Sequence, residues 1–385
     1  MHRTPLVATR ADPAASALPR RRTRASPSHV LGLRLAEERC ERFPTGEVHA
    51  AMKYLVTGGA GFIGSHLVEH LVTEGHEVVV LDDLSSGRLD NLKSVLDRVQ
   101  FVEGSVTDLD ACRAVTRSVD FVLHEAALTS VSRSVDEPML AHQVNVTGTM
   151  NVLLAARETR VRRVVYAAST AAYGDAVELP NREDMLPRPL SPYAATKLAA
   201  EEYCRAFLAT YGLETVSLRY FNVFGPRQDP MSPYAAAIPR FIIAALVGNA
   251  PTIYGDGNQT RDFTFVTNIV HANLLACHAS ARRVAGQVFN VGGGRQISIN
   301  EVWQRIQDLV GVRLPARHGD PRPGEVRDSV ASIERARADL GYSPQVDFEE
   351  ALWRTVASYR TWVPGADRPA TRVPLRTRTV SAREA

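Results

Sequence analysis

The sequence predicts an α/β fold: a doubly wound parallel sheet with a smaller C-terminal lobe. From residue 53 to about residue 222, short runs rich in Val, Ile and Leu alternate with segments whose apolar residues recur at helical spacing. Continuous apolar strands separated by helices are typical of a parallel sheet that is covered on both faces. After residue 222 the pattern becomes irregular, with clusters of Pro and Gly. We therefore expect residues 52–222 to form the sheet domain and residues 223–363 to form the lobe.

The individual elements follow from these runs in chain order. Strands are expected over residues 53–58, 77–82, 99–104, 121–126, 163–169 and 215–221. Helices are expected over residues 61–74, 135–157 and 193–211 of the sheet domain, and over residues 299–309 and 333–340 of the lobe. The crossovers between parallel strands should be right-handed.

The two ends of the chain carry its positive charge. Residues 1–51 contain nine Arg against five acidic residues, and residues 364–385 contain five Arg against two, so the formal charge of +3 leaves residues 52–363 at −4. Both ends are expected to be disordered. The leader lacks the apolar segment of a secretory signal, while an organelle transit peptide or a natural start at Met52 stays open. Because the folded body has no basic excess, no nucleic-acid partner is expected.

Hydropathy and cysteine usage narrow the class of protein further. The chain of 385 residues has no run of about 18 apolar residues, so no membrane span is expected. Its four cysteines, Cys40, Cys112, Cys204 and Cys277, are far apart and form no metal-ligand spacing. We expect free thiols in a reducing compartment, a cytoplasmic protein and no metal site.

The segment VTGGAGFIGSHL follows the first expected strand and opens the first expected helix. Gly58 permits a tight turn, Gly61 lets the backbone approach a pyrophosphate, and Gly64 permits close packing of helix against strand. The N-terminus of the helix adds free N–H groups and a positive dipole end. In this strand–turn–helix setting, the motif predicts a dinucleotide site of the Rossmann type.

Asp82 ends the second expected strand, 18 residues after Gly64. A carboxylate at this position accepts hydrogen bonds from ribose hydroxyls and repels a 2′-phosphate, which favours NAD over NADP. The nearby Arg88 argues in the other direction. A loop-capping role for Asp82 is the structural alternative.

A second set of residues predicts acid–base chemistry. Ser169 ends the fifth expected strand, at the edge where doubly wound folds bind ligands. In SPYAATK, Tyr193 and Lys197 follow the helix start signals Ser191 and Pro192, and their spacing of four places them on one helix face. Lys197 and an oxidised nicotinamide ring would lower the pKa of Tyr193 by stabilising its phenolate. The set would then deprotonate an alcohol held by Ser169 while hydride leaves its carbon. A solvated helix face is the alternative for Tyr193 and Lys197.

These motifs, together with LHEAAL, NVTGT, RYFNVFGPRQDP, YGDGNQTRDFTFV, FNVGGG and RPGEVRDS, resemble the extended short-chain dehydrogenase/reductase family over nearly all of residues 52 to about 359. Within that family the sequence looks most like NAD-dependent nucleotide-sugar 4-epimerases, particularly UDP-N-acetylglucosamine 4-epimerases. The resemblance implies a tightly held NAD and a 4-keto sugar that forms when Tyr193 takes the C4 hydroxyl proton. The sugar would rotate and receive hydride on its other face. Lys197 would bind the nicotinamide ribose.

The resemblance also assigns residues by motif position. For NAD these are Phe62, Ile63, Ser105, Val106, Ala126, Ala127, Asn145 and Tyr220, beside the glycines, Asp82, Tyr193 and Lys197. For the nucleotide sugar they are Asn222, Tyr254, Arg261, Arg322, Glu325 and Ser329, beside Ser169. Tyr254 would stack on uracil, and the two arginines would hold the diphosphate, with ion pairs between the lobes as the alternative. Ser105 replaces the usual Asp that contacts the adenine amine.

Residues near the sugar indicate the substrate. A bulky Tyr at the position of Ser329 restricts the family's pocket to unsubstituted hexoses, so Ser329 favours UDP-GlcNAc and UDP-GalNAc, with UDP-Glc and UDP-Gal as further candidates. Thr170 and Ala171 stand where the related sugar dehydratases carry an acidic pair. Decarboxylating relatives need a Glu at the position of Ala171, so elimination is not expected. A UDP-glucuronate 4-epimerase, an oxidoreductase or 2-epimerase-like relative, and a non-catalytic NAD-binding regulator stay open.

The resemblance further implies a homodimer that packs through the helices near residues 135–157 and 193–211. Apolar stripes that only face the core are the alternative. The expected partners are therefore a UDP-sugar and a second copy of the chain.

Overall fold

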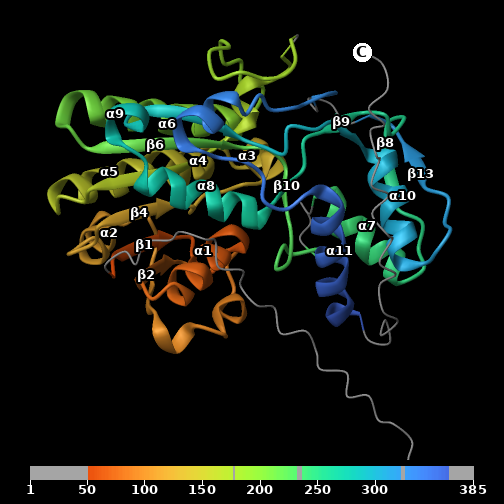
Figure 1. Ribbon diagram of the computed structural model, residues 1–385, viewed down its shortest axis with the longest axis horizontal. Helices are drawn as coiled ribbons and strands as arrows, with labels where there is room; N and C mark the ends of the chain where they lie inside the picture. The colour runs from red at the N-terminus through yellow and green to blue at the C-terminus, as the bar shows by residue number, and fades with distance from the viewer. Residues whose placement is uncertain (1–50, 177, 232–235, 322–325, 364–385) are drawn as a thin grey trace, which may run out of the picture. The chain divides into compact units, whose positions relative to one another are not determined.

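Seven parallel strands form the central sheet of the computed structural model, which describes residues 51–176, 178–231, 236–321 and 326–363 (Figure 1). Their order across the sheet is β11-β6-β5-β4-β1-β2-β3. The strands are β1 (Lys53–Thr57), β2 (Glu77–Asp82), β3 (Gln100–Glu103), β4 (Phe121–His124), β5 (Arg163–Ser169), β6 (Glu214–Tyr220) and β11 (Gln287–Val291). The doubly wound parallel sheet is thus confirmed. Residues 1–50 and 364–385, which include nearly all of the predicted leader and the whole predicted tail, lie outside the described residues.

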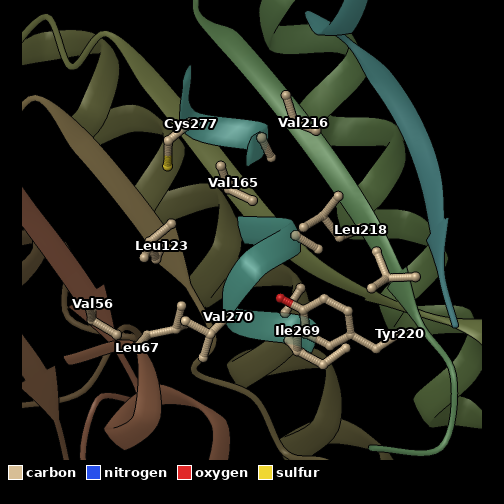
Figure 2. Close-up of a cluster of buried hydrophobic side chains, with 14 of the residues drawn as sticks. Val56, Leu67, Leu123, Val165, Val216, Leu218, Tyr220, Ile269, Val270 and Cys277 are labelled. Carbon is tan, nitrogen blue, oxygen red and sulfur yellow. The ribbon is translucent and has the colours of Figure 1, made fainter. Parts of the chain in front are cut away.

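Helices cover both faces of this sheet. On one face α1 (Phe62–Thr73) and α8 (Val266–His278) bury Leu67, Ile269 and Val270 against Val56 and Leu123 of the strands (Figure 2). On the other face lie α2 (Leu109–Val115), α5 (Gly148–Glu158) and α6 (Pro192–Tyr211). Successive strand residues point to opposite faces, and each fully buried aliphatic side chain contributes about 1.5–3 kcal/mol to folding. This alternation explains why the strands read as continuous apolar runs.

The predicted helix over residues 135–157 is wrong as a single element. The chain forms α3 (Val131–Asp136), α4 (Pro138–His142), a five-residue π-helical segment (Gln143–Thr147) and then α5. Pro138 stands at the first position of α4, where its missing N–H costs nothing but prevents α3 from continuing. The π-helical segment is a local widening of the helix of the kind often found at functional sites.

A third buried cluster forms the core of the lobe. It packs α7 (Ala237–Leu246), α10 (Ile299–Val310) and α11 (Phe348–Tyr359) together (Figure 1). The rings of Phe241 and Trp303 meet edge to face with centroids 5.8 Å apart. The lobe also contains three short strand pairs: β7 (Val223–Phe224) with β10 (Thr264–Phe265), β8 (Thr252–Tyr254) with β13 (Arg317–Gly319), and β9 (Thr260–Arg261) with β12 (Ile297–Ser298). The predicted helix at 299–309 is confirmed, whereas that at 333–340 is largely a π-helical segment (Ala336–Leu340).

The predicted boundary at residue 222 does not separate the sheet from the lobe. Helix α8 and strand β11 both follow it in sequence, yet α8 packs on the sheet and β11 pairs with β6 from Gln287↔Val216 to Val291↔Tyr220. An unpaired β6 edge would leave a row of backbone groups open, and β11 covers it. The remaining short elements are η1 (Leu89–Leu92), η2 (Leu96–Arg98), η4 (Thr170–Tyr173), α9 (Ala281–Val284) and η6 (Arg360–Trp362).

No helix in the described part of the chain is both long enough and apolar enough to cross a lipid bilayer. Cys112, Cys204 and Cys277 are buried free thiols, while Cys40 lies outside the described residues.

Candidate active site

The glycine turn between β1 and α1 is too tight for side chains. Gly58 has a φ of +69°, and a Cβ there would lie 2.7 Å from the backbone nitrogen of Ala126. A Cβ on Gly64 would lie 2.2 Å from the carbonyl oxygen of Gly58. Gly61 is the N-cap of α1, and no side chain caps this helix end. The first-turn N–H groups therefore face the turn without a side-chain acceptor, as an anion-binding helix terminus requires.

Asp82 holds this turn from the end of β2. Its Oδ2 accepts a 2.9 Å hydrogen bond from the N–H of Ala60, and its Oδ1 accepts another of 2.9 Å from the N–H of Leu84. Burial raises the pKa of Asp82, and these two backbone hydrogen bonds oppose the rise. Asp82 also lines the cavity beside the turn. The capping role and the cofactor role predicted as alternatives are therefore compatible in one side chain.

A cavity of about 390 Å³ opens at the carboxyl ends of β1, β2 and β4. Nine of the residues predicted to bind the cofactor line it: Gly58, Gly61, Phe62, Ile63, Gly64, Asp82, Val106, Ala126 and Ala127. Arg227, Gln228 and Asp229, from the loop after β7, line it as well and were missed. The glycines leave room for a pyrophosphate, the helix end offers donors, and Asp82 supplies a carboxylate for ribose, so these residues fit a dinucleotide.

Five other predicted cofactor residues do not line this cavity: Ser105, Asn145, Tyr193, Lys197 and Tyr220. Asn145, in the π-helical segment, instead bonds Leu128 at both its N–H (2.8 Å) and its carbonyl (3.1 Å), and it donates to the hydroxyl of Thr196 at 3.0 Å. It thus ties the segment behind the cavity wall to α6 and acts as a positioning residue. The hydroxyl of Ser105 accepts from the hydroxyl of Thr107 at 3.1 Å.

Ser169 and Tyr193 come together as predicted. Ser169 ends β5, where its Oγ accepts a 3.2 Å hydrogen bond from the N–H of Ala171. Tyr193 lies in the first turn of α6, which Ser191 caps by accepting from the N–H of Ala194 at 3.2 Å. Burial raises the pKa of Tyr193, and a hydrogen bond with Ser169 opposes that rise. The net effect is a raised pKa, and Lys197 is not among the groups that act on it, so the predicted lowering by Lys197 is not found.

Lys197 lies one turn further along α6. Its Nζ donates a 2.7 Å hydrogen bond to the carbonyl of Ala167 and lies 5.0 Å from the centre of the Tyr166 ring. Burial lowers the pKa of Lys197 to about 8, and the negative charge of Glu125 opposes the decrease. In this geometry the hydrogen bond that lowers the pKa of Tyr193 comes from Ser169, while the Lys197 ammonium is held on the strand backbone.

Tyr220 and Glu125 form a hydrogen bond near the carboxyl ends of β6 and β4. Tyr220 pairs with Ser169 in the register of β5 and β6. Its hydroxyl donates to Oε1 of Glu125 at 2.7 Å and accepts from Nδ2 of Asn273, also at 2.7 Å. Burial raises the pKa of Glu125 to about 7. Glu125 lines the dinucleotide cavity and was missed, although an acid directly after an apolar strand was a visible signal.

A second cavity, of about 280 Å³, adjoins the first because Val223 and Ala236 line both. Of the residues predicted to bind the nucleotide sugar, Asn222, Tyr254 and Arg261 line it. Arg240 on α7 lines it too and was missed. An aromatic ring and two guanidinium groups in one cavity are suited to a base and a diphosphate.

The other predicted substrate residues lie elsewhere. Ser329 is buried and lines neither cavity, and its Oγ has no hydrogen-bond partner among the described residues. Arg322 and Glu325 lie outside the described residues.

Asp262 positions the residues around the second cavity. Its fully buried carboxylate accepts hydrogen bonds from the N–H groups of Gly293 (2.7 Å), Gly294 (3.0 Å) and Ala331 (3.0 Å). Burial raises the pKa of Asp262 to about 6, and these backbone donors oppose the rise. Because Asp262 follows Arg261 directly, these hydrogen bonds hold Arg261 in place relative to the segment that contains Ser329.

The geometry defines a class of protein: an α/β enzyme that binds a nicotinamide dinucleotide at the carboxyl edge of its sheet and places a serine–tyrosine pair at the same edge. Residues 54–292, more than half of the chain, match the NAD dependent epimerase/dehydratase family. The chain belongs to this family, and its cofactor is NAD.

Three similar proteins show what the family contains. A UDP-glucose 4-epimerase of Mycolicibacterium smegmatis is 41% identical over 313 residues, which cover 80% of this chain and 99% of the relative. The structure of a UDP-N-acetylglucosamine 4-epimerase from Methanobrevibacter ruminantium, in complex with UDP-N-acetylmuramic acid, is 38% identical with a TM-score of 0.78 and covers 82% of this chain and 100% of that one. A UDP-glucose 4-epimerase from Thermus thermophilus, solved with NAD, is 37% identical with a TM-score of 0.74 and covers 81% and 100%.

Proposed function

We propose that the chain catalyses C4 epimerisation of a UDP-hexose, with UDP-GlcNAc and UDP-GalNAc as its substrate pair and UDP-Glc and UDP-Gal as a second pair. The observation that carries this proposal is the proximity of Ser169 to Tyr193, whose pKa it lowers, near the carboxyl edge of the sheet where the first cavity opens, with the second cavity adjoining the first. The names of the three relatives support 4-epimerisation of UDP-sugars.

Tyr193, Ser169 and Lys197 have different roles in this reaction. Tyr193, as phenolate, accepts the proton of the C4 hydroxyl, and Ser169 donates a hydrogen bond to the same sugar oxygen, which stabilises the charge that develops there. NAD, when bound in the first cavity, would supply the two-electron acceptor for the C4 hydride and its donor on return, with no net redox change. Tyr193 then gives its proton back to the C4 oxygen of the product. Lys197, fixed on the Ala167 carbonyl, supplies a positive charge beside this proton transfer.

The second cavity supports a UDP moiety. Tyr254 offers a ring for stacking on uracil, and Arg261 and Arg240 offer guanidinium groups whose planar fork matches phosphate oxygens. The two cavities adjoin at Val223, so a sugar attached to a diphosphate in one lies next to the dinucleotide in the other. Ser329 is small, which leaves room for a 2-acetamido group if the sugar reaches it.

The experiment that tests this function uses purified protein without added NAD. It is incubated separately with UDP-GlcNAc, UDP-Glc and UDP-glucuronate, and the C4 epimers are resolved by proton NMR. Formation of UDP-GalNAc is the expected result. Conversion of UDP-Glc alone would keep 4-epimerisation and reject the N-acetylated substrate, and conversion of UDP-glucuronate alone would place the chain among uronate epimerases. Inactivity on all three, persisting after NAD is added, would reject the proposal.

Ser329→Tyr tests the pocket argument within an active enzyme. We expect this variant to lose turnover of UDP-GlcNAc while retaining that of UDP-Glc. Ser343→Tyr is the matched control, because Ser343 is exposed. Equal loss on both sugars would mean that Ser329→Tyr disturbs the fold and not the sugar pocket.

We also propose a homodimer that packs through α3, α4 and α6. Val135 and Met139 are 60% and 68% exposed on α3 and α4, and Tyr203 and Tyr211 are 40% and 51% exposed on α6. Exposed apolar side chains on adjacent helices are typical of an interface. Light scattering should give a dimer mass for the native chain and a monomer mass for Val135→Glu with Met139→Glu. Leu186→Glu, at an exposed apolar residue off these helices, should leave the dimer intact.

A further inference from the structure

The carboxyl group of Glu125 opens toward the dinucleotide cavity without a protein counter-ion in contact. Among the described residues its Oε1 accepts one hydrogen bond, from Tyr220 at 2.7 Å, and the charge of Lys197 acts on it without an ion pair between the two. Its Oε2 has no hydrogen-bond partner in the same part of the chain, and Glu125 is one of the residues that line the cavity. A carboxylate that is largely buried and lacks a cation in contact is costly in free energy, and a ligand in the cavity can offset that cost.

Glu125 links the wall of this cavity to the candidate catalytic residues. Its hydrogen-bond partner Tyr220 is the register partner of Ser169, and the charge of Lys197 acts on Glu125. A nicotinamide ring that exchanges hydride beside Tyr193 has to lie close to these residues. The oxidised ring carries a positive charge and the reduced ring is neutral.

We propose that Glu125 makes the site prefer the oxidised cofactor, because its carboxylate stabilises the cationic ring of NAD⁺ and gains nothing comparable from NADH. The preference favours return of the hydride to the sugar over retention of a reduced cofactor. The inference rests on NAD as the cofactor and not on the identity of the sugar, so it is tested without any sugar.

Other titratable groups surround Glu125, and their behaviour decides the pH range of the test. Burial raises the pKa of Glu125 to about 7, so its charge is lost as the pH falls through that value. Lys197 of α6 has a pKa lowered to about 8, and the pKa values of Tyr193, Tyr166 and Tyr220 are all raised by burial. His124, the preceding residue, has its pKa lowered to about 3 by burial and stays neutral. Between pH 6 and pH 7.5, Glu125 is thus the group near the ring whose charge changes most.

The test measures the dissociation constants of NAD⁺ and NADH by calorimetry and NADH fluorescence at several pH values, for the native chain and Glu125→Gln. Glutamine retains an oxygen that accepts from the Tyr220 hydroxyl but carries no charge. Above pH 7 we expect NAD⁺ to bind about tenfold more weakly to Glu125→Gln, with NADH affinity nearly unchanged. The native preference for NAD⁺ should rise with pH through about 7, and this rise should be absent in the variant. Glu202→Gln, an exposed charge removal on α6, should behave as the native chain.

The inference would be overturned if Glu125→Gln bound NAD⁺ and NADH more weakly by the same factor, or if the pH dependence of binding were unchanged in this variant. Glu125 would then only hold the Tyr220 hydroxyl in place. Tyr220→Phe keeps the test valid if Glu125→Gln does not fold. The Tyr220 hydrogen bond lowers the pKa of Glu125, so Tyr220→Phe should move the onset of NAD⁺ preference to higher pH. An onset that stays in place would contradict the proposal.

Discussion

The Nζ of Lys197 donates a 2.7 Å hydrogen bond to the carbonyl oxygen of Ala167, two residues before Ser169 on β5. The bond anchors the ammonium group on the backbone of the strand that ends in the candidate catalytic serine. This position of Lys197 distinguishes it from Ser169, which is the residue that acts on the pKa of Tyr193. Ser169 opposes the rise that burial causes in the pKa of Tyr193, and Lys197 is held on the strand backbone.

Ser169→Ala should shift the acid limb of the pH–rate profile upward. Burial raises the pKa of Tyr193 and the Ser169 hydrogen bond opposes the rise, so its removal leaves the phenolate accessible only at higher pH. At pH 7 we expect kcat/KM to fall by about 10² or more, a typical loss for a group that assists proton transfer. Ser191→Ala is the control: it removes a helix cap worth about 1 kcal/mol and should lower the melting temperature without moving the limb. An unmoved limb in Ser169→Ala would contradict this assignment.

The alkaline limb of the profile should report Lys197. Its pKa is lowered to about 8 by burial, so the ammonium is present below that pH and is lost as the pH rises through it. When it is lost, the phenolate of Tyr193 loses a stabilising charge and the rate declines. Arginine stays charged throughout this range, so Lys197→Arg should lower the maximal rate but remove the decline near pH 8. A decline that persists unchanged would assign the alkaline limb to another group.

The sheet was predictable from the sequence because its strands are buried on both faces. Strands 77–82 and 163–169 match β2 and β5 at both ends, and their continuous apolar runs leave no competing helix pattern. Strand β11 was missed because the short run QVFNV follows an irregular stretch. Its place beside β6 depends on long-range pairing, which local pattern does not contain. Pro138 was present in the predicted helix 135–157, and its breaking effect was not given enough weight.

The candidate site was predictable where a motif imposes a backbone shape. A Cβ on Gly58 or Gly64 would lie 2.7 or 2.2 Å from backbone atoms. Glycine is therefore required at both positions, and the spacing of the glycines predicted the shape of the turn. Glu125 and Arg240 were missed because their roles arise from which cavity they face, and that depends on the packing of distant segments. Asn145 was predicted to line the NAD cavity, yet it bonds Leu128 and Thr196, a distinction that sequence position alone does not make.

Two glycine substitutions should separate folding from cofactor binding. A Cβ on Gly64 would meet the Gly58 carbonyl at 2.2 Å, so Gly64→Ala should displace α1 from β1 and lower the melting temperature by several degrees or prevent folding. A Cβ on Gly61 would lie 3.1 Å from the same oxygen, in a backbone conformation open to alanine. Gly61→Ala should therefore fold but bind NAD more weakly, since its methyl group faces the cavity. Calorimetric titration with NAD and thermal melts of both variants check this, and a Gly61→Ala variant with native affinity would contradict it.

The buried ion pair of Glu201 and Arg219 should support the helix that carries Tyr193 and Lys197. Arg219 donates to both carboxylate oxygens of Glu201 at 2.6 and 2.9 Å, and the side chains are 3% and 1% exposed. Removing one partner leaves an uncompensated buried charge, so Glu201→Ala should lower the free energy of unfolding by about 3–5 kcal/mol. Glu202→Ala, the exposed neighbour on α6, should change it by less than about 0.5 kcal/mol.

A double variant distinguishes the pair itself from the helix around it. Replacing a buried ion pair by apolar side chains of similar volume is often neutral, so Glu201→Leu with Arg219→Met should recover most of the stability lost in Glu201→Ala. Arg219 also stacks on the ring of Tyr173, with 4.6 Å from the guanidinium carbon to the ring centre, and the hydroxyl of Tyr173 donates to Asn290 of β11 at 2.6 Å. If the double variant is no more stable than Glu201→Ala, the contacts of Arg219 with Tyr173 and of Tyr173 with Asn290 account for the lost free energy of unfolding. Urea titration of the three variants decides between the two.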